Sequence, residues 1–404
     1  MALRRLRRES GSNQLQHSPI PMQHRESLPR RNDLRISFNY RSKKSRNIFG
    51  FILSVVALRT LRHLFPTLIT FGSQAKQSLW IPLTEEEYIN FTSSSRLARN
   101  PCKQPFSHCC IGQCRQAHYE LNERDSMYKY NGSSAPLATF SDVLDYYHDH
   151  YTMEQSKSCN IVFIGDSLSS DHAMGAACDL IGKGYDLISC NNAYFGFHEL
   201  YGEDRNVTCM ENLYPHFGHH VLENRSAKSC PRVTIGSILM TNNTADILRE
   251  AREVHENGGL IIFNWGVHCN SKKENCIINA LTSSILPMLR GDKSTQYSQW
   301  KFLYRETEPQ HFSGPGGLYH SDSFGKKASC YADEVDNWRN EEVQDFMSLH
   351  NLTHDIPTIE IFRPLSTLYQ LHHPPDCTHY CYNPLRLDVT WDSMLRVLER
   401  NKEL

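Results

Sequence analysis

From about residue 140 onward, short apolar runs alternate with longer stretches of helical periodicity. Three of the runs are rich in β-branched and aromatic residues, which is typical of buried parallel strands: Cys159–Gly165, Leu260–Asn264 and Trp300–Tyr304. Apolar residues recur at helical spacing in Leu168–Ile181 and Ala245–Glu256, and glycines follow both stretches. Strands that alternate with helices predict an α/β fold, in which a mainly parallel sheet carries helices on both faces.

One more helix is predicted near the C-terminus. Asp388 has a side chain suited to a helix N-cap, and Trp391, Leu395 and Leu398 after it fall on one helical face. Apolar residues make up 39% of the chain, which is enough to fill a core. The composition therefore excludes a wholly disordered chain.

The first 46 residues differ in charge from the rest of the chain. They hold 12 Lys and Arg against 3 Asp and Glu, and they lack hydrophobic periodicity. The remaining residues hold 31 Lys and Arg against 41 Asp and Glu, so a basic tail over residues 1–46 precedes a mildly acidic body. Because an acidic body lacks the positive surface that nucleic acids require, we expect no nucleic-acid partner.

A membrane-targeting segment is predicted at residues 47–72. Ile48–Leu58 is an unbroken run of 11 apolar or small residues, and extension to Gly72 brings Arg59 near the centre of the span. As a helix, 11 residues cover only about 17 Å of the roughly 30 Å hydrocarbon core. Two interpretations are open, a retained single-pass signal-anchor and a cleaved signal peptide, and both place the basic N-terminus in the cytosol. The mean hydropathy of −0.52 excludes a polytopic membrane protein.

Cysteines and glycosylation sequons share the region beyond this segment. All 14 cysteines lie at or after Cys102. The six Asn-x-Ser/Thr sequons begin at Asn90, Asn131, Asn206, Asn224, Asn242 and Asn351. An even cysteine count together with sequons is typical of an oxidising, glycosylating compartment, so we expect the body in the lumen of the secretory pathway. A cytosolic protein with many free thiols is the alternative.

Residues 73–150 are predicted to form a luminal stem with a cysteine cluster. The cluster comprises Cys102, Cys109, Cys110 and Cys114. We expect disulfide bonds among these cysteines or to the body, and zinc is the alternative because His108 lies among them. No Cys-x2-Cys pair with a matching distal pair accompanies the cluster, so we expect neither a metal nor a cofactor.

Three groups of residues are candidates for chemistry. In Gly165-Asp166-Ser167-Leu168, Ser167 follows a strand and its N–H lies at the start of a helix, where a nucleophile can face an oxyanion. Asn264 ends a middle strand, where its amide can donate to the same oxyanion. Asp376 precedes His379 by three residues, a spacing that lets a carboxylate orient an imidazole. Taken singly, these groups are as typical of a turn, a helix cap or an exposed side chain.

Taken together, the three groups resemble a known family. The order Ser, Asn, Asp-x-x-His resembles that of the SGNH (GDSL-type) hydrolase superfamily. The segment Asp376–Leu395, DCTHYCYNPLRLDVTWDSML, is similar to the D-C-S-H-W-C and D-x-W signature that ends the PC-esterase domain of trichome-birefringence-like proteins. Thr307–Gly314 resembles their S-P-x-H-F-x-G segment, and Ser329-Cys330-Tyr331 follows it. The resemblance covers about residues 155–400.

The resemblance implies a three-layer αβα SGNH-hydrolase-like catalytic domain over residues 151–404. It implies a triad of Ser167, His379 and Asp376, with the Ser167 N–H and the Asn264 amide as oxyanion donors. His311 is expected to be a structural histidine that bonds a loop carbonyl. Where plant members read F-N-T-G-H-W-W this chain has FNWGVHC, so acceptor specificity does not carry over.

The implied function is serine-dependent O-acyl transfer, O-acetyl transfer above all, to a polysaccharide or glycoprotein glycan through an acyl-Ser intermediate. The expected partners are an acyl donor, a glycan acceptor and, through residues 47–72, the Golgi membrane. A carbohydrate O-acetyl esterase with the same triad and a non-catalytic glycan-binding ectodomain are the alternatives. The endoplasmic reticulum, or secretion after signal cleavage, is the alternative location.

Overall fold

The computed structural model divides the chain into two compact units, Met1–Gln74 and Ala75–Leu404, and every described residue belongs to the second. The described residues are 79–93, 128–133, 135–151, 158–192, 210–211, 217–239, 258–269, 272, 275–290, 300–319, 330–331, 335–373, 376–381 and 383–401. The predicted basic tail, membrane segment, cysteine cluster and helix at Ala245–Glu256 lie outside them. No helix among these residues is both long and apolar enough to span a membrane.

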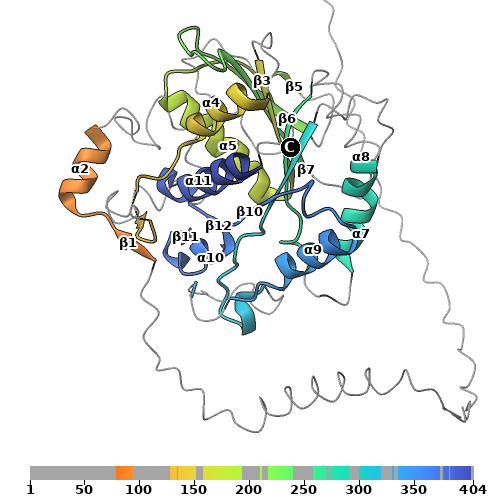
Figure 1. The fold of residues 1–404 in the computed structure, drawn as a ribbon. Helices are drawn as coiled ribbons and strands as arrows, with labels where there is room; N and C mark the ends of the chain where they lie inside the picture. Colours follow the sequence, from red (N-terminus) through yellow and green to blue (C-terminus); the bar gives the residue numbers. More distant parts are fainter. Residues whose placement is uncertain are drawn as a thin grey trace, which may run out of the picture. The chain divides into compact units, whose positions relative to one another are not determined.

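An eight-stranded sheet lies at the centre of the second unit (Figure 1). Its strands, in spatial order, are β10 (Thr358–Ile359), β9 (Trp300–Arg305), β8 (Gly259–Phe263), β3 (Ser158–Gly165), β7 (Arg232–Leu239), β6 (Phe217–Glu223), β4 (Asp186–Asn192) and β5 (Met210–Glu211). The strands from β10 to β7 are parallel, and β6 is antiparallel to both of its neighbours. The prediction of a mainly parallel sheet is confirmed, and the three predicted strands correspond to β3, β8 and β9.

Side chains of the central strand alternate between two cores, one on each face of the sheet. Ile161 and Phe163 of β3 lie in the core covered by α4 (Phe140–Tyr151), α5 (Ser167–Gly182) and α11 (Pro384–Arg400). Val162 and Ile164 lie in the core covered by α7 (Cys276–Ala280), α8 (Leu286–Arg290) and α9 (Trp338–Leu349), as Figure 1 shows. Because both faces of β3 are buried, its central residues Ile161–Ile164 are all apolar rather than alternating. Helices on both faces of the sheet are thus confirmed.

The last helix, α11, begins earlier than the sequence pattern predicts. Its N-cap is Asn383, whose side-chain oxygen accepts the N–H groups of Leu385 and Arg386, and Pro384 occupies the first helical position. Asp388, predicted as the N-cap, is buried within the helix. The prediction at Asp388 was wrong because Asn383, five residues earlier and followed by Pro384, already satisfies the first backbone donors.

Part of the predicted stem belongs to the main core. β1 (Trp80–Pro82) pairs with β2 (Tyr128–Tyr130), and α2 (Glu85–Ser93) lies between them in the chain. Trp80 is 1% exposed, and its indole N–H donates to the carbonyl oxygen of Pro364 at 2.7 Å. Phe140 of α4 packs on Trp391 of α11, with ring centroids 4.9 Å apart. The predicted boundary near residue 150 therefore does not separate a stem from the body, because side chains on both sides of it fill one core.

Disulfide bonds and a short hairpin complete the described structure. Cys159 pairs with Cys230, Cys269 with Cys276 and Cys330 with Cys377, and Cys178 and Cys381 are also disulfide-bonded. The expectation of disulfide bonds is confirmed for these cysteines. After the short helix α10 (Phe362–Leu365), β11 (His372–His373) and β12 (Asp376–Tyr380) form an antiparallel pair just before α11.

Candidate active site

The turn between β3 and α5 holds Ser167 at the first position of a helix. A Cβ on Gly165 would lie 2.3 Å from the main-chain oxygen of Asn264 and 2.3 Å from the Ser169 Oγ, so only glycine fits there. Asp166 is the N-cap, and its Oδ1 accepts the Leu168 N–H at 3.1 Å. As the first helical residue, Ser167 has an N–H with no acceptor inside the helix, and this group points out of the positive end of α5.

Asp166 also connects this turn to the segment after β8. Its second oxygen, Oδ2, accepts the N–H of Val267 at 3.3 Å, and the side chain is 1% exposed. A buried carboxylate that accepts backbone N–H groups on two sides fixes both segments relative to each other. Asp166 therefore holds the turn that carries Ser167.

Ser167, His379 and Asp376 form a continuous chain of hydrogen bonds. The Ser167 Oγ lies 2.6 Å from the His379 Nε2, and the His379 Nδ1 lies 2.7 Å from the Asp376 Oδ2. The side chains of His379 and Asp376 are each 38% exposed, so solvent and small molecules reach them. The residues come from the start of α5 and from β12, which are 212 positions apart in the sequence. The structure thus brings together three of the residues that the sequence singles out.

The Asp376 carboxylate uses its two oxygens differently. Oδ2 accepts from the imidazole, while Oδ1 accepts the N–H groups of Thr378 and His379 at 2.9 and 3.2 Å. Burial opposes ionisation, but the hydrogen bond and charge of His379 and the two backbone N–H groups outweigh it and lower the pKa of Asp376 to about 2. Asp376 is therefore ionised at every physiological pH.

The pKa of His379 moves in the opposite direction. Burial opposes the charged imidazole, but the hydrogen bond to Asp376 and the charges of Asp171, Asp376 and Asp166 raise the pKa of His379 to about 9. With this pKa the ring is mostly protonated at neutral pH, and its neutral form is a strong base for a neighbouring hydroxyl. The arrangement can therefore deprotonate Ser167 and hold the resulting imidazolium.

No protein-family model and no curated protein sequence matches this chain.

A disulfide bond and two histidines fix the position of β12. Cys377, between Asp376 and Thr378, is bonded to Cys330 and is fully buried. The His372 Nδ1 lies 2.7 Å from the main-chain oxygen of His379. The His311 Nε2 lies 3.0 Å from the carbonyl oxygen of Ser366, and the His311 Nδ1 lies 2.7 Å from the His372 Nε2, so the two rings share their protons among three contacts. His311 is thus a buried histidine that bonds a loop carbonyl, as expected, and it supports the strand that carries His379.

Asn264 does not lie in the chain of hydrogen bonds around Ser167. Its side chain is fully buried, and its Nδ2 donates to the main-chain oxygen of Arg305 at 3.0 Å and to the Thr307 Oγ1 at 2.9 Å. Both N–H bonds of the amide are therefore used inside the protein. The expected role as an oxyanion donor is corrected: the Asn264 side chain joins the end of β8 to the end of β9.

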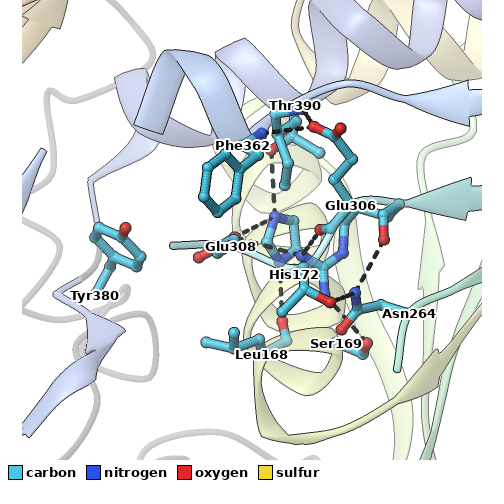
Figure 2. A network of polar contacts seen from close by, with 12 residues as sticks. Leu168, Ser169, His172, Asn264, Glu306, Glu308, Phe362, Tyr380 and Thr390 are labelled. Atoms are coloured by element: carbon cyan, nitrogen blue, oxygen red, sulfur yellow. Dashed lines mark hydrogen bonds and ion pairs between the residues drawn. The ribbon is translucent and has the colours of Figure 1, made fainter. Parts of the chain in front are cut away.

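Beneath α5 lies a buried network of charged and polar side chains, part of which Figure 2 shows. Glu308 is fully buried; its Oε2 lies 2.8 Å from the Arg386 Nη1, and its Oε1 lies 3.5 Å from the Arg305 Nη1 and 3.1 Å from the His172 Nε2. Arg386 also lies over the ring of Tyr380, 4.8 Å from its centroid. The two ion pairs of Glu308 join the end of β9 to α11.

His172 is the member of this network that belongs to α5. Its Nδ1–H donates to the carbonyl oxygen of Leu168 at 2.9 Å. Burial and the charges of Arg305 and Arg386 keep the pKa of His172 well below its ordinary value, so the ring is neutral. The hydroxyl of Thr390 on α11 then donates to its Nε2 at 3.2 Å (Figure 2). The first turns of α5, and with them Ser167, are fixed against α11.

The asparagines of four sequons belong to the described residues. Asn90, Asn131 and Asn351 are exposed, and Asn224 is half-buried with its Oδ1 accepting both the N–H and the hydroxyl of Ser226. Asn206 and Asn242 lie outside the described residues. Asn90, Asn131 and Asn351 are therefore accessible from solvent, whereas the Asn224 side chain is bonded within its own sequon.

Proposed function

We propose that this chain is a serine-dependent O-acyltransferase, an O-acetyltransferase above all, that acts on polysaccharide or glycoprotein glycans. The observation that carries the proposal is the hydrogen-bonded chain from the Ser167 Oγ through the His379 ring to the Asp376 carboxylate, at 2.6 and 2.7 Å. A serine, a histidine and a carboxylate in this order are the parts that acyl transfer requires. The glycan acceptor is proposed from the resemblance to PC-esterase domains.

In the first half of the reaction Ser167 becomes acylated. Its Oγ attacks the acyl carbonyl while His379 accepts its proton, and Asp376 stabilises the imidazolium. The tetrahedral intermediate collapses as the bond to the leaving oxygen breaks and the imidazolium returns its proton to that oxygen. The oxyanion is held by the Ser167 N–H at the start of α5, and one such donor lowers the barrier by about 3 kcal/mol.

In the second half a hydroxyl removes the acyl group. His379 accepts the proton of that hydroxyl, its oxygen attacks the acyl-Ser167 carbonyl, and Ser167 leaves with a proton from the imidazolium. A sugar hydroxyl gives transfer and water gives hydrolysis. Hydrolysis, and hence a carbohydrate O-acetyl esterase, is the second candidate because the 38% exposure of His379 allows water to reach the base.

We propose further that the fold is the three-layer αβα arrangement of SGNH hydrolases, in the PC-esterase, trichome-birefringence-like branch. Three features support this: a mainly parallel sheet with helices on both faces, Ser167 directly after the central strand β3, and Asp376 and His379 just before the last helix. No metal or cofactor takes part in the proposed chemistry.

A luminal location, in the Golgi membrane above all, is proposed from the disulfide bonds and the sequons. Disulfide bonds persist in oxidising compartments. Asn90, Asn131 and Asn351 are exposed, as acceptors of glycans must be. Attachment to the membrane would be through residues 47–72.

The proposal is tested with the full-length protein and its Ser167→Ala variant. A fluorophosphonate probe is expected to label the wild type and to give only background labelling of Ser167→Ala, because the probe reacts with an activated serine. A labelled acetyl donor and a panel of oligosaccharides are then supplied, and mass spectrometry follows the acetyl group on Ser167, on sugar and as free acetate.

The outcomes separate the candidates. Label on sugar that depends on Ser167 supports transfer and names the acceptor. Free acetate without acetylated sugar, across the panel, supports the esterase. A folded wild type that neither reacts with the probe nor turns over the donor contradicts both and favours a glycan-binding ectodomain.

A further inference from the structure

The first turns of α5 expose a narrow polar strip on a helix that is otherwise buried. From Ser167 to Cys178, only Ser167, Ser170 and Asp171 are not buried. Ser167 and Asp171 are four residues apart, so their Cβ atoms lie about 5–6 Å from each other on one helical face. Because the Ser167 Oγ is 2.6 Å from the His379 Nε2, the imidazole lies over this strip as well.

The Asp171 carboxylate makes none of the side-chain hydrogen bonds found among the described residues of this region. Ser170 is bonded to the Ser237 hydroxyl of β7 at 2.9 Å, whereas the influences on the Asp171 carboxylate are burial and charge, with no hydrogen bond to a described residue among them. A half-buried carboxylate without such bonds is destabilising unless a positive charge compensates it. The Asp171 carboxylate therefore needs a positively charged group nearby that compensates its charge.

His379 is that partner. The charged groups that act on Asp171 are His379 and Asp376 of β12, Arg386 of α11 and Glu308, and His379 has the largest effect. In return, Asp171 has the largest effect of any charge on His379, apart from the hydrogen bond that His379 makes with Asp376. The imidazole thus lies between two carboxylates, one hydrogen-bonded at Nδ1 and one on the side of Ser167.

We propose that Asp171 is a positioning residue of the acyl transfer, a second carboxylate that stabilises the imidazolium formed when His379 takes the Ser167 proton. This inference rests on the proposed function, because it assigns Asp171 a part in the same reaction. Asp171 acts through His379 and makes no contact with substrate. It supplies charge, whereas Asp376 supplies both charge and the orientation of the ring.

Because Asp171 stabilises the imidazolium, it affects how the reaction rate depends on pH. His379 must be neutral to accept a proton, so the rate rises as pH rises through its pKa, which the neighbouring carboxylates raise to about 9. Burial raises the pKa of Asp171 to about 6, so its charge is present where His379 titrates. Without that charge the pKa of His379 falls, the base becomes weaker, and the rise in rate moves to lower pH.

The experiment measures the rate of fluorophosphonate labelling of the full-length protein from pH 5 to pH 10. For Asp171→Asn we expect the midpoint of the rise to move down by about one pH unit, the effect of an opposite charge within about 4–6 Å. The rate at high pH should fall several-fold. Asp171→Glu, which restores the charge, should recover the wild-type profile.

Asp179→Asn is the matched control, since it removes a carboxylate from the same helix about two turns from Asp171 and should leave the profile unchanged. An unchanged midpoint in Asp171→Asn, with the wild type labelled normally, overturns the inference and leaves the proposed function intact. Equal loss of labelling in Asp171→Asn and Asp171→Glu, with a lowered Tm in both, assigns Asp171 a structural role and also overturns it. A wild type that is not labelled at any pH overturns the proposed function, and the inference with it.

Discussion

The two oxygens of Asp376 make separable contributions to the site. One accepts the N–H groups of Thr378 and His379, which shapes the start of β12, and the other accepts from the imidazole. An asparagine at this position keeps an oxygen for the backbone but presents an NH2 group or an uncharged oxygen to the ring. The ring then loses both its compensating charge and its fixed tautomer.

We therefore expect Asp376→Asn to fold normally and to react slowly. The labelling rate should fall by about 10³–10⁴-fold, as for the loss of a triad carboxylate, while the Tm changes little. Asp355→Asn, which changes an exposed carboxylate outside β12, is the control and should label at the wild-type rate. Wild-type labelling by Asp376→Asn would show that Asp376 does not support the base.

Residues whose partners are close in sequence could be predicted, and residues with distant partners could not. Asp376 and His379 are three positions apart, so their contact follows from local spacing. Asn264 is bonded to Arg305 and Thr307, 41 and 43 positions away, and nothing near Asn264 in the sequence indicates that its amide is already used. Asp171 was not identified, although its spacing of four from Ser167 places it on the same helical face.

Among the elements, β12 depends on a disulfide bond for its place beside α5. Cys377 is the residue next to Asp376, and its bond to Cys330 closes a loop with a sequence separation of 47. Replacement of both cysteines by serine should lower the free energy of unfolding by about 4 kcal/mol, from the chain entropy that the bond removes. Because the bond lies inside the strand that carries the base, the labelling rate should fall as well.

Removal of the Cys269–Cys276 bond is the matched comparison. Its sequence separation is 7, so the same relation gives about 2 kcal/mol, and it lies outside β12. Chemical denaturation followed by fluorescence measures both losses, and probe labelling measures activity. A Cys330→Ser/Cys377→Ser variant that labels at the wild-type rate would contradict the dependence of His379 on this bond.

The buried network around Glu308 connects the elements that carry the two halves of the site. Removal of Glu308 leaves Arg305 and Arg386 buried without their carboxylate. Glu308→Ala should therefore lower the free energy of unfolding by about 3–5 kcal/mol, the cost of breaking a buried ion pair from one side. Arg396→Gln, which breaks an exposed pair with Asp392 on α11, should change it by less than about 1 kcal/mol. Equal effects of the two variants in urea denaturation would contradict this.

Elements buried on both sides were the easiest to predict. β3, β8 and β9 are rich in apolar residues because each contacts a core on either face of the sheet. The start of α11 was predicted too late, although Asn383 followed by Pro384 is a strong N-terminal signal. Asp388 also resembles an N-cap because an apolar face follows it. It lies inside α11, however, because the residues before it continue the same face.

On the scale of the whole molecule, the core joins segments from both ends of the described chain. Phe140 of α4, Phe163 of β3 and Trp391 of α11 pack together, with the Trp391 ring 4.9 Å from that of Phe140 and 6.3 Å from that of Phe163. A boundary near residue 150 was predicted because the pattern of alternating strands and helices begins near there. Which side chains share a core is a property of the tertiary fold, and the start of this pattern does not record it.

The same arrangement sets an order of events during synthesis. A ribosome makes Ser167 long before His379, which follows it by 212 residues, and Trp391 comes later still. A chain interrupted at any point before β12 carries the serine without its base, and one interrupted before Trp391 lacks the ring that Phe140 and Phe163 pack against. On the proposed function, chains that end before β12 are therefore inert, and reactivity requires synthesis through Trp391.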